Sequence, residues 1–385
     1  MKKTADVIII GGGIIGTSIA AFLSSKKVGS ILLLEKGLLG EGSTSRCAGG
    51  IRRLFTTPIN IEFSLLSREI FDNFQEIFGV DPEFHPSGYL FLATTRGEFA
   101  GLKSSGLLQR SFGVDVEVLL PQEIIKRWPY LYIGDLSGGT FCGTDGYAGP
   151  YEILQGYVKK ARANGVEIRE NCEVIDILVR RGVIQGVKIK SGEILSSPIV
   201  VDAAGPYAGI VSEMAGVSIP IFPLKRQLFT TAPFSELPEE IPLTIDLHAG
   251  WYIRREGKGL LISGPQGNDY GFSLETDFEG RIFAANHAMH RVPRLKDATI
   301  HNSWAGLYAV TPDNHAIIGS HPGLNGFIIA GGFSGHGFQH SPATGIVISE
   351  LIAEGAPKSL KINSLSVDRF DKGRLNKEIL TAFRD

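Results

Sequence analysis

The stretch Asp6-Val7-Ile8-Ile9-Ile10-Gly11-Gly12-Gly13-Ile14-Ile15-Gly16 decides the fold. Its β-branched run predicts a buried parallel strand, and the glycines that follow have the G-x-G-x-x-G spacing. Apolar residues then recur at helical spacing as far as Leu23, and a second apolar run, Ile31–Leu34, ends at Glu35. Strand, glycine turn, helix, strand and acidic residue form the order of a dinucleotide-binding unit.

The glycines and the acidic residue each have a physical role in such a unit. Gly11 permits the tight turn, Gly13 lets the backbone approach a pyrophosphate, and Gly16 lets the helix pack closely on the strand. Glu35 can accept hydrogen bonds from ribose hydroxyls, while the amino terminus of the helix faces the phosphates. The pattern does not choose between FAD and NAD, because both occupy this crevice.

A loop of small residues follows, Gly40-Glu41-Gly42-Ser43-Thr44-Ser45-Arg46-Cys47-Ala48-Gly49-Gly50-Ile51-Arg52. An NAD-binding domain would normally continue here with further strand and helix units. A glycine-rich extended segment can instead run along a flat ring at close approach, because it lacks bulky side chains. Composition alone also fits a flexible surface loop, but the position directly after the fingerprint favours a flavin.

Three further segments extend this pattern toward the end of the chain. They are residues 199–208 (IVVDAAGPYA), residues 303–319, which include SWAGLY and TPDNH, and residues 331–345, which include GGFSGHGFQ and SPATG. Together with the loop, they resemble the D-amino acid oxidase superfamily of flavoproteins, which contains sarcosine oxidase, glycine oxidase and dye-linked L-proline dehydrogenase. The resemblance spans nearly the whole chain in family order.

We therefore predict an α/β fold of the D-amino acid oxidase type, in which a Rossmann-like FAD-binding domain is interleaved with a substrate domain built on an antiparallel sheet. The FAD-binding domain is assigned to residues 1–84, 141–215 and 301–385, and the substrate domain to residues 85–140 and 216–300. A chain of 385 residues is longer than a single hydrophobic core usually accommodates, which agrees with two domains.

Periodicity predicts several further elements. Helices are expected over residues 59–78 and 151–164, a hairpin over 173–178 and 183–190 around Arg181-Gly182, and strands over 260–263 and 327–330. Ser341-Pro342 has the form of an N-cap followed by proline at the first helical position, so a helix is expected from there to about Ala353. The positive end of that helix would favour the negative charge that a reduced flavin accumulates.

Composition excludes several functional classes. The formal net charge of −2 and pI near 6.5 argue against a nucleic-acid partner. Three cysteines without a C-x-x-C pair indicate neither a disulfide framework nor a metal site. No apolar run has the length of a signal or membrane-spanning segment. A cytoplasmic location is expected, and peripheral membrane association stays open.

The resemblance also bears on the substrate. Glycine oxidase and D-amino acid oxidase place a carboxylate-binding arginine where this sequence has Tyr308, which disfavours a primary amine. Monomeric sarcosine oxidase attaches its flavin to a cysteine at the position of Gly306 and binds carboxylate through a lysine at Gln339, so noncovalent FAD is expected here. Residues 143–152, together with 304–306 and 334–338, look most like the catalytic β subunits of sarcosine oxidase and L-proline dehydrogenase, which favours a secondary amino acid.

Two further expectations follow from the same resemblance. The lysine that promotes the reaction with oxygen has no counterpart in Gly259-Leu260-Leu261-Ile262, which favours a dehydrogenase over an oxidase. Pro150 stands where heterotetrameric sarcosine oxidase has a flavin-linked histidine, so any second flavin would be unattached. A second flavoprotein or electron-transfer subunit is a possible partner.

The candidate catalytic residues are Arg52, which would bind the substrate carboxylate bidentately, Tyr252, which would close the pocket, and His336, which would contact the flavin. The alternatives are that Arg52, like Arg53, is an exposed surface charge and that Tyr252 is a core residue. The candidate FAD-binding residues are Gly11, Gly13, Ile14, Ile15, Gly16, Glu35, Lys36, Ser43, Thr44, Ser45, Arg46, Ala48, Gly49, Gly50, Ile51, Val174, Ala203, Ala204, Gly205, Gly306, Gly332, Ser334, Gly335, His336, Gly337, Phe338 and Gln339. No metal ligands are predicted.

Three other functions remain open at this point. One is a glycine or D-amino acid oxidase, and another is a 2-hydroxy acid or glycerol-phosphate dehydrogenase, because fold does not fix function. The third is a flavoprotein subunit whose role is structural and that needs a partner. Substrate screening separates the enzymes, and the size of co-purified complexes tests the subunit.

Overall fold

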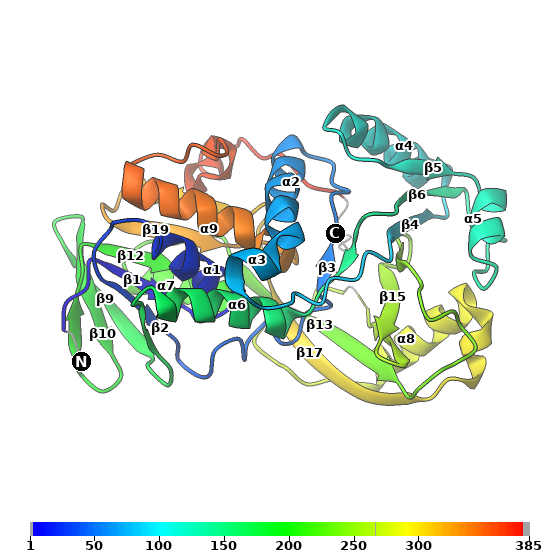
Figure 1. Cartoon of the computed structure of the whole chain (residues 1–385), viewed down its shortest axis with the longest axis horizontal. Coiled ribbons are helices and arrows are strands. Elements are labelled where there is room, and N and C mark those ends of the chain that lie inside the picture. The colour runs from blue at the N-terminus through cyan, green and yellow to red at the C-terminus, as the bar shows by residue number, and fades with distance from the viewer. Residues whose placement is uncertain (1–2, 266, 380–385) are drawn as a thin grey trace.

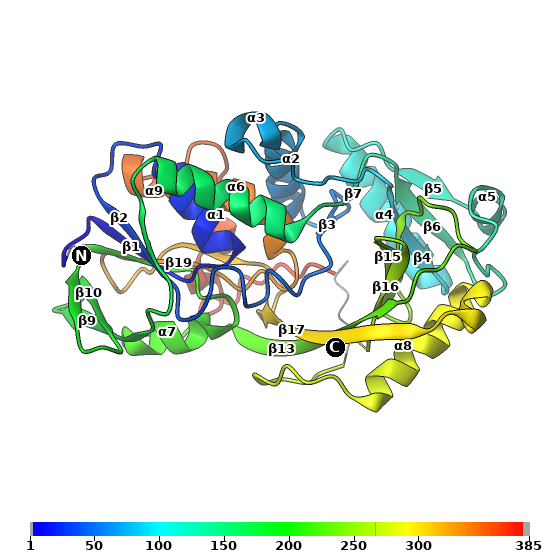
Figure 2. The ribbon, with the colours of Figure 1, turned by 60° about the horizontal axis from the view of Figure 1, so that its bottom comes forward.

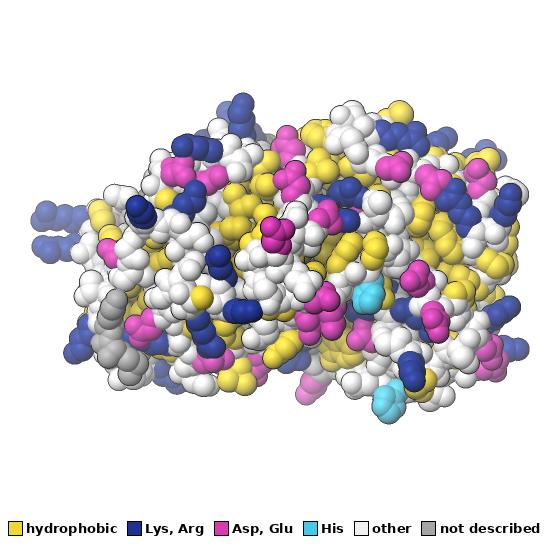
Figure 3. Space-filling model, viewed as in Figure 1, with side chains coloured by type: hydrophobic (Ala, Val, Ile, Leu, Met, Phe, Trp, Pro, Cys, Tyr) yellow, Lys and Arg dark blue, Asp and Glu magenta, His cyan; other side chains and the backbone are white. Residues whose placement is uncertain are grey.

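The computed structural model describes residues 3–265 and 267–379. It contains a six-stranded sheet in one half of the molecule and an eight-stranded sheet in the other, which lie at the left and right of Figure 1. Basic and acidic side chains are interspersed over the face seen in Figure 3. Within the described residues, no helix is both long and apolar enough to cross a membrane.

The six-stranded sheet is built from the fingerprint and from distant parts of the chain. Its order is β18-β19-β12-β1-β2-β8, with β18 antiparallel to β19 and the other pairs parallel. The strands are β1 (Val7–Ile10), β2 (Ile31–Leu34), β8 (Glu167–Arg169), β12 (Ile199–Asp202), β18 (Ile317–Ser320) and β19 (Phe327–Gly331). β1 and β2 are buried along their full length, as expected for a parallel sheet covered on both faces.

Helices cover one face of this sheet and a small sheet covers the other. The first face packs on α1 (Ile14–Leu23), α6 (Pro150–Ala163) and α9 (Gly337–Glu354), with α2 (Pro58–Asp72) and α3 (Phe74–Phe78) beside them. The second face packs on α7 (Ala208–Met214) and on the sheet β11-β10-β9. The strands of that sheet are β9 (Val174–Arg180), β10 (Val183–Ile189) and β11 (Ile194–Ser196).

The eight-stranded sheet has the order β17-β13-β16-β15-β14-β4-β6-β5, and all neighbours are antiparallel except β14 and β4. Its strands are β4 (Tyr89–Ala93), β5 (Glu117–Leu119), β6 (Gly138–Cys142), β13 (Phe222–Thr231), β14 (Leu243–Asp246), β15 (Trp251–Glu256), β16 (Gly259–Ser263) and β17 (Ile300–Val310). Side chains alternate between its two faces. We call the face that carries Tyr89, Leu228 and Tyr252 the inner face.

The opposite, outer face of that sheet carries Trp251 and Phe229 and packs on α8 (Phe278–Arg291). α4 (Arg96–Ser111) and α5 (Pro121–Arg127) lie beyond β4, β5 and β6, and Figure 2 shows β13 and β17 running from beside α7 toward α8. A two-stranded sheet, β3 (Gly50–Ile51) with β7 (Gly146–Tyr147), joins the two halves.

The structure corrects two predicted helices. The helix expected over 59–78 is divided at Asn73 into α2 and α3. The helix expected to begin at Ser341-Pro342 begins at Gly337, with His336 as its N-cap, and Pro342 lies inside it. The prediction took the glycines for loop and the proline for a start signal, whereas a glycine can open a helix and Pro342 forfeits only one backbone hydrogen bond. The predicted hairpin and the strands at 260–263 and 327–330 agree with β9, β10, β16 and β19.

Two predicted domain boundaries differ from the sheet order. Residues 301–310 were assigned to the FAD-binding domain, but β17 pairs with β13 along almost its whole length and therefore belongs to the eight-stranded sheet. β6 likewise crosses the boundary predicted at residue 140. The remaining domain limits stay predictions.

Candidate functional site

The glycine turn after β1 is as tight as the fingerprint requires. Gly11 has a φ of +110°, and a Cβ there would lie 2.4 Å from the carbonyl oxygen of Ala203. A Cβ at Gly16 would lie 1.9 Å from the carbonyl oxygen of Gly11, so α1 can pack against the turn only with glycine there. The Ile14 amide at the start of α1 donates to Thr44 Oγ1 at 2.9 Å, which brings the small-residue loop to the helix amino terminus.

The surface in front of this turn fits a dinucleotide. A Cβ added at Gly13 would meet only Thr44 Oγ1 among the described atoms, at 3.3 Å, and one added at Gly42 or Gly205 would meet no described atom within 4 Å. A pyrophosphate needs this open backbone beside the first amides of a helix. Ile14 and Ile15 point their side chains into the core, so only their backbone could contribute.

Glu35 lies at the end of β2, where the ribose is expected. Its two carboxylate oxygens accept from the amides of Gly12 and Gly37, at 2.7 and 2.8 Å, which fixes the direction of the carboxylate. The Cys172 amide donates to the Glu35 carbonyl at 2.8 Å, so the segment leading to Val174 passes beside it, although the Val174 side chain is in the core. Lys36 Nζ lies 3.1 Å from the centre of the Tyr207 ring, just after the turn formed by residues 203–205.

The small-residue loop crosses the inner face of the eight-stranded sheet. Ser43 Oγ donates to the Leu307 carbonyl at 2.6 Å, and Trp304 Nε1 donates to the Arg46 carbonyl at 3.2 Å. A Cβ at Gly306 would lie 3.0 Å from Arg46 Cβ, so β17 and the loop are in close contact. Ser45 Oγ and Arg46 Nε both donate to the Glu41 carbonyl and stabilise the loop itself.

Further along, the loop reaches β15 and β4. The Ala48 carbonyl accepts from Arg254 Nε at 2.7 Å, and Gly49, with a φ of +70°, turns the chain into β3. A Cβ at Gly50 would lie 3.2 Å from the Tyr89 hydroxyl. The loop predicted to accompany a flavin is therefore a fixed segment between the two halves of the molecule.

The turn between β19 and α9 closes the same region. Gly332 and Gly335 have φ values of +73° and +90°, and a Cβ at Gly335 would lie 2.5 Å from the Tyr308 ring. Ser334 Oγ accepts from the Thr311 amide, while Gln339 Oε1 accepts from the Arg52 amide at 2.7 Å. The first turn of α9, from Gly337, thus faces the end of the small-residue loop. The Phe338 side chain instead packs against Phe71 in the core.

Arg52 is buried rather than exposed, with 5% of its surface accessible. Its guanidinium donates to the Leu54 carbonyl, and its Nη2 lies 3.3 Å from His336 Nε2. The guanidinium carbon lies 3.9 Å from the centre of the Phe55 ring. Burial lowers the pKa of Arg52 against the opposing attraction of Tyr89 and more distant carboxylates. Arg53 points elsewhere and forms a 2.8 Å ion pair with Asp145.

His336 is also buried and is held as a neutral ring. Burial lowers its pKa well below the ordinary value, and the positive charge of Arg52 lowers it further. A neutral His336 can accept a hydrogen bond from Arg52 at Nε2 and so fix the direction of the guanidinium. His340, one turn further along α9, has a pKa lowered to about 3, chiefly by burial.

Tyrosines complete the cluster on the inner face. Tyr252 hydrogen-bonds with Tyr308, and burial raises the pKa of both hydroxyls, as it does for Tyr89. The sequence prediction included Tyr252 but missed Tyr89, Tyr308 and Arg226 as site residues. Arg226 stands within the polar run Lys225-Arg226-Gln227, which gave no signal of a buried site, and the two tyrosines could not be separated from core residues.

The described side chains around this cluster do not form a metal-binding site. Across residues 3–265 and 267–379, no group of three or more His, Cys, Asp or Glu side chains could hold a metal ion. Cys47, Cys142 and Cys172 are free, and burial raises the pKa of Cys47 to about 11, which keeps it a thiol.

Comparisons with known proteins agree with this arrangement. The structure of L-proline dehydrogenase from P. horikoshii matches with a TM-score of 0.91 and 33% identity, covering 98% of this chain and 100% of that one. Glycine oxidase from Geobacillus kaustophilus matches with a TM-score of 0.84 and 26% identity over 95% of this chain and 99% of its own.

Curated relatives point the same way. FAD-dependent oxidoreductase domain-containing protein 1 of Xenopus laevis is 32% identical over 96% of this chain and 83% of its own length. Mouse mitochondrial sarcosine dehydrogenase is 28% identical over 96% of this chain, which spans only 42% of that protein. The model of the DAO family, described as FAD dependent oxidoreductase, matches residues 6–351. The chain belongs to the DAO family of FAD-dependent oxidoreductases.

Proposed function

We propose that this protein oxidises the C–N bond of a secondary amino acid and that Arg52 binds the substrate carboxylate. The observation that carries the proposal is the buried Arg52 guanidinium, which lies at the end of the small-residue loop, beside His336 and near Tyr308. A guanidinium matches a carboxylate bidentately, and such a contact is strongest where water is excluded.

The surrounding residues would position the substrate and exclude water. Neutral His336 orients Arg52, and Tyr252 and Tyr308 retain their protons because burial raises their pKa. These hydroxyls can donate hydrogen bonds but would not accept a proton near neutral pH. The amine must therefore reach the site with a neutral nitrogen. Bound FAD would supply the acceptor for the two electrons and the hydrogen that leave the substrate carbon.

Two features favour a secondary over a primary amine. By the resemblance above, Tyr308 stands at the position where glycine oxidase has its carboxylate-binding arginine. In this structure Tyr308 hydrogen-bonds with Tyr252. Proteins named L-proline dehydrogenase, sarcosine dehydrogenase and dimethylglycine dehydrogenase are among the relatives, and the first is 33% identical over nearly the whole of both chains.

The cofactor is proposed to bind without a covalent bond, and the electron acceptor is proposed to be other than oxygen. Gly306 offers no side chain for attachment, and β16 presents the buried run Gly259–Ser263 where an oxygen-activating lysine would stand. An electron-transfer subunit would then be needed as a partner, which size measurement of co-purified complexes tests. A cytoplasmic location also stays a prediction.

The test is the absorption spectrum of the purified holoenzyme, mixed without oxygen with sarcosine, L-proline, glycine, D-alanine and 2-hydroxy acids in turn. Bleaching of the flavin band by sarcosine or proline, with slow recovery in air, is the expected result. Bleaching only by glycine, D-alanine or a hydroxy acid would overturn the substrate class. Acid precipitation should release the yellow colour into the supernatant, and colour retained by the pellet would contradict noncovalent binding.

A further inference from the structure

A second buried arginine faces the same site from the eight-stranded sheet. Arg226 lies on β13 opposite Gly306 of β17, and its neighbour along the same face is Tyr308, which is opposite Leu224. Only 5% of Arg226 is accessible, and its guanidinium carbon lies 5.6 Å from the centre of the Tyr308 ring. Arg226, on the sheet, and Arg52, at the end of the loop, both act on the Tyr308 hydroxyl, because the positive charge of each opposes the rise of its pKa.

Backbone carbonyls fix the position of Arg226. Its Nη1 donates to the carbonyl oxygens of Lys225 and Gly267, at 2.9 and 2.8 Å. The segment that carries Gly267 is itself paired with β13, because the Lys225 amide donates to the Asp269 carbonyl and the Gly271 amide to the Pro223 carbonyl. The guanidinium is thus preorganised, and ligand binding would cost little ordering of this side chain.

Charge gives the reason to expect an anion there. Burial lowers the pKa of Arg226 to about 10, against the attraction of Tyr308, Tyr252, Tyr270 and Asp269. The same is true of Arg52, whose pKa burial also lowers. Burial is thus the largest cause of the lowered pKa in both arginines, and a ligand that brings two carboxylates would offset the burial of both guanidinium groups.

Arg255 shows what a purely structural arginine on this sheet does. It points to the outer face, and it donates to the carbonyls of Phe234, Leu237 and Pro238, which tie the chain before β14 to β15. Arg226 also donates to backbone carbonyls, but it does so on the face toward the small-residue loop, beside Tyr252 and Tyr308. Because the two arginines lie on different faces of the sheet, Arg255 has a structural role, whereas Arg226 is placed to bind a ligand.

We infer that Arg52 and Arg226 bind the two carboxylates of one substrate, a secondary amine that carries a carboxylate on each of its two nitrogen substituents, with Tyr308 between them. This inference rests on the proposed function and narrows its substrate class to imino diacids. A monocarboxylate such as sarcosine would engage Arg52 alone.

Binding of analogues that cannot be oxidised tests the inference without relying on turnover. Thiodiacetate and (methylthio)acetate replace the amine by a thioether and differ by one carboxylate. Each is titrated into the FAD-loaded protein, and the change in the flavin spectrum gives its Kd. Since a hydrogen-bonded charged contact is usually worth a factor of about ten or more, the diacid should bind at least about tenfold more tightly.

Two variants assign the effect to a residue. Arg226→Gln should reduce the preference for the diacid to below about threefold, while Arg255→Gln, which removes a buried arginine from the outer face, should leave the preference intact. Equal affinities of the two analogues for the unmodified protein would overturn the inference, as would a preference that survives Arg226→Gln. The comparison in the unmodified protein decides the matter even if a variant fails to fold.

The outcomes also separate this inference from the proposed function. If sarcosine or proline bleaches the flavin but the diacid has no advantage, the inference fails and the proposed function stands. If no secondary amine bleaches the flavin and neither analogue alters its spectrum, both fail together.

Discussion

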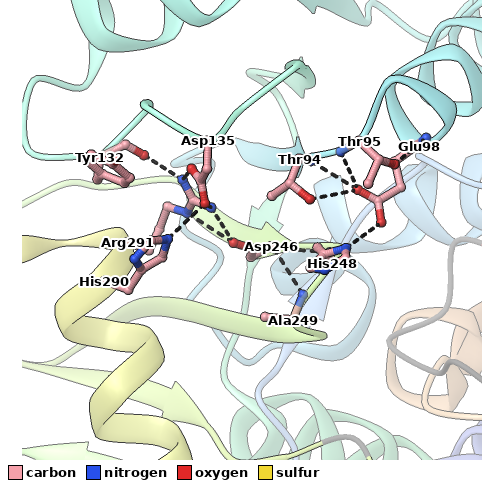
Figure 4. Close-up of polar contacts among 10 residues, drawn as sticks. All are labelled: Thr94, Thr95, Glu98, Tyr132, Asp135, Asp246, His248, Ala249, His290 and Arg291. Atoms are coloured by element: carbon pink, nitrogen blue, oxygen red, sulfur yellow. Dashed lines mark hydrogen bonds and ion pairs between the residues drawn. The ribbon is translucent and has the colours of Figure 1, made fainter.

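Arg291 lies on the outer side of the eight-stranded sheet and Arg52 and Arg226 on its inner side, and all three are buried but have different surroundings. On the outer face, Arg291 is 1% exposed and lies between two carboxylates, with Nη2 at 2.6 Å from Asp246 and Nη1 at 2.8 Å from Asp135 (Figure 4). On the inner face, carbonyl oxygens and aromatic rings hold Arg52 and Arg226. The ion pairs of Arg291 serve the fold, whereas Arg52 and Arg226 lie on the side of the sheet that faces the small-residue loop, where we infer that they receive an anionic ligand.

Figure 4 shows how local the outer-face network is. Arg291 reaches from the last turn of α8 to the Tyr132 carbonyl and to Asp135, and His290 contacts the same carboxylate at 2.8 Å. A second group, in which His248 lies 3.2 Å from Glu98, ties α4 to the turn after β14. Both groups connect elements of the same half of the molecule, so we expect their loss to affect stability and not substrate affinity.

The largest effect is expected for Arg291→Met. The substitution would leave Asp246, which is 4% exposed, as a buried charge without its cation, at a cost of about 3 to 5 kcal/mol in unfolding free energy. Urea denaturation measures this cost, and the affinity of the folded variant for (methylthio)acetate should not change. Asp135→Asn is the matched control, with a smaller effect because Asp135 is partly exposed. A loss below about 1 kcal/mol for Arg291→Met would erase the contrast between the faces.

The next effect concerns Arg52→Gln. Removing a charge-assisted contact should weaken the Kd of a carboxylate ligand by about 10- to 100-fold, corresponding to about 1.5 to 3 kcal/mol. The flavin absorbance reports this Kd directly. Arg53→Gln is the control one residue away, because the Arg53 side chain is turned toward Asp145. Equal losses in the two variants would show that general charge, and not the placement of Arg52, governs binding.

The unfolding free energy should depend on pH because His340 is buried as a neutral ring. The pKa of His340 is lowered to about 3, so the unfolded chain takes up a proton below about pH 6.5 that the folded protein excludes. The stability that His340 contributes is therefore present above about pH 6.5 and is lost progressively as pH falls toward 3, by up to about 1.4 kcal/mol per pH unit. His340→Asn should flatten the unfolding free energy against pH over this range. An unchanged slope would contradict the buried neutral ring.

The smallest effect is expected for Tyr308→Phe. Loss of the hydroxyl removes a hydrogen bond that Tyr308 would donate to the bound carboxylate ligand, worth about 1 kcal/mol, so ligand Kd should weaken by about fivefold. Tyr130→Phe is the matched control, because the buried Tyr130 hydroxyl bonds to no other described group. Its removal should leave both Kd and stability unchanged or slightly improved. Tighter binding by Tyr308→Phe would mean that the hydroxyl obstructs the ligand.

Local chemistry made the nucleotide half predictable. The turn at Gly11 and the packing at Gly16 follow from short-range patterns and have the expected geometry, and Glu35 lies at the end of β2, where its role toward a ribose stays a prediction. The start of α9 was mispredicted because two local rules conflicted there. Proline is usual at the first position of a helix, but the turn at Gly335 already sets the helix start at Gly337.

The cluster on the inner face was harder to foresee, because strand register creates it. Arg226 and Tyr308 become neighbours only through the pairing of β13 with β17, and Tyr252 joins them from β15. Periodicity indicates that a strand has two faces but does not say which distant strand lies beside it. Arg52 could be proposed as a site residue from its position after the loop, whereas its burial and its contact with His336 required the structure.

The strand order β19-β12-β1-β2 has a consequence for how the protein is made. β1 begins at Val7, yet β19, which completes this order beyond β12, ends at Gly331, and Ser18 Oγ donates to the Ser341 carbonyl at 2.7 Å. Contacts between such distant segments close late and slow folding. During translation, a nascent chain that has not yet exposed β19 carries β12 with an open edge, and such edges attract other strands. The sheet is thus completed only after β19 and the start of α9 have left the ribosome, so a molecular chaperone has its greatest value before that point.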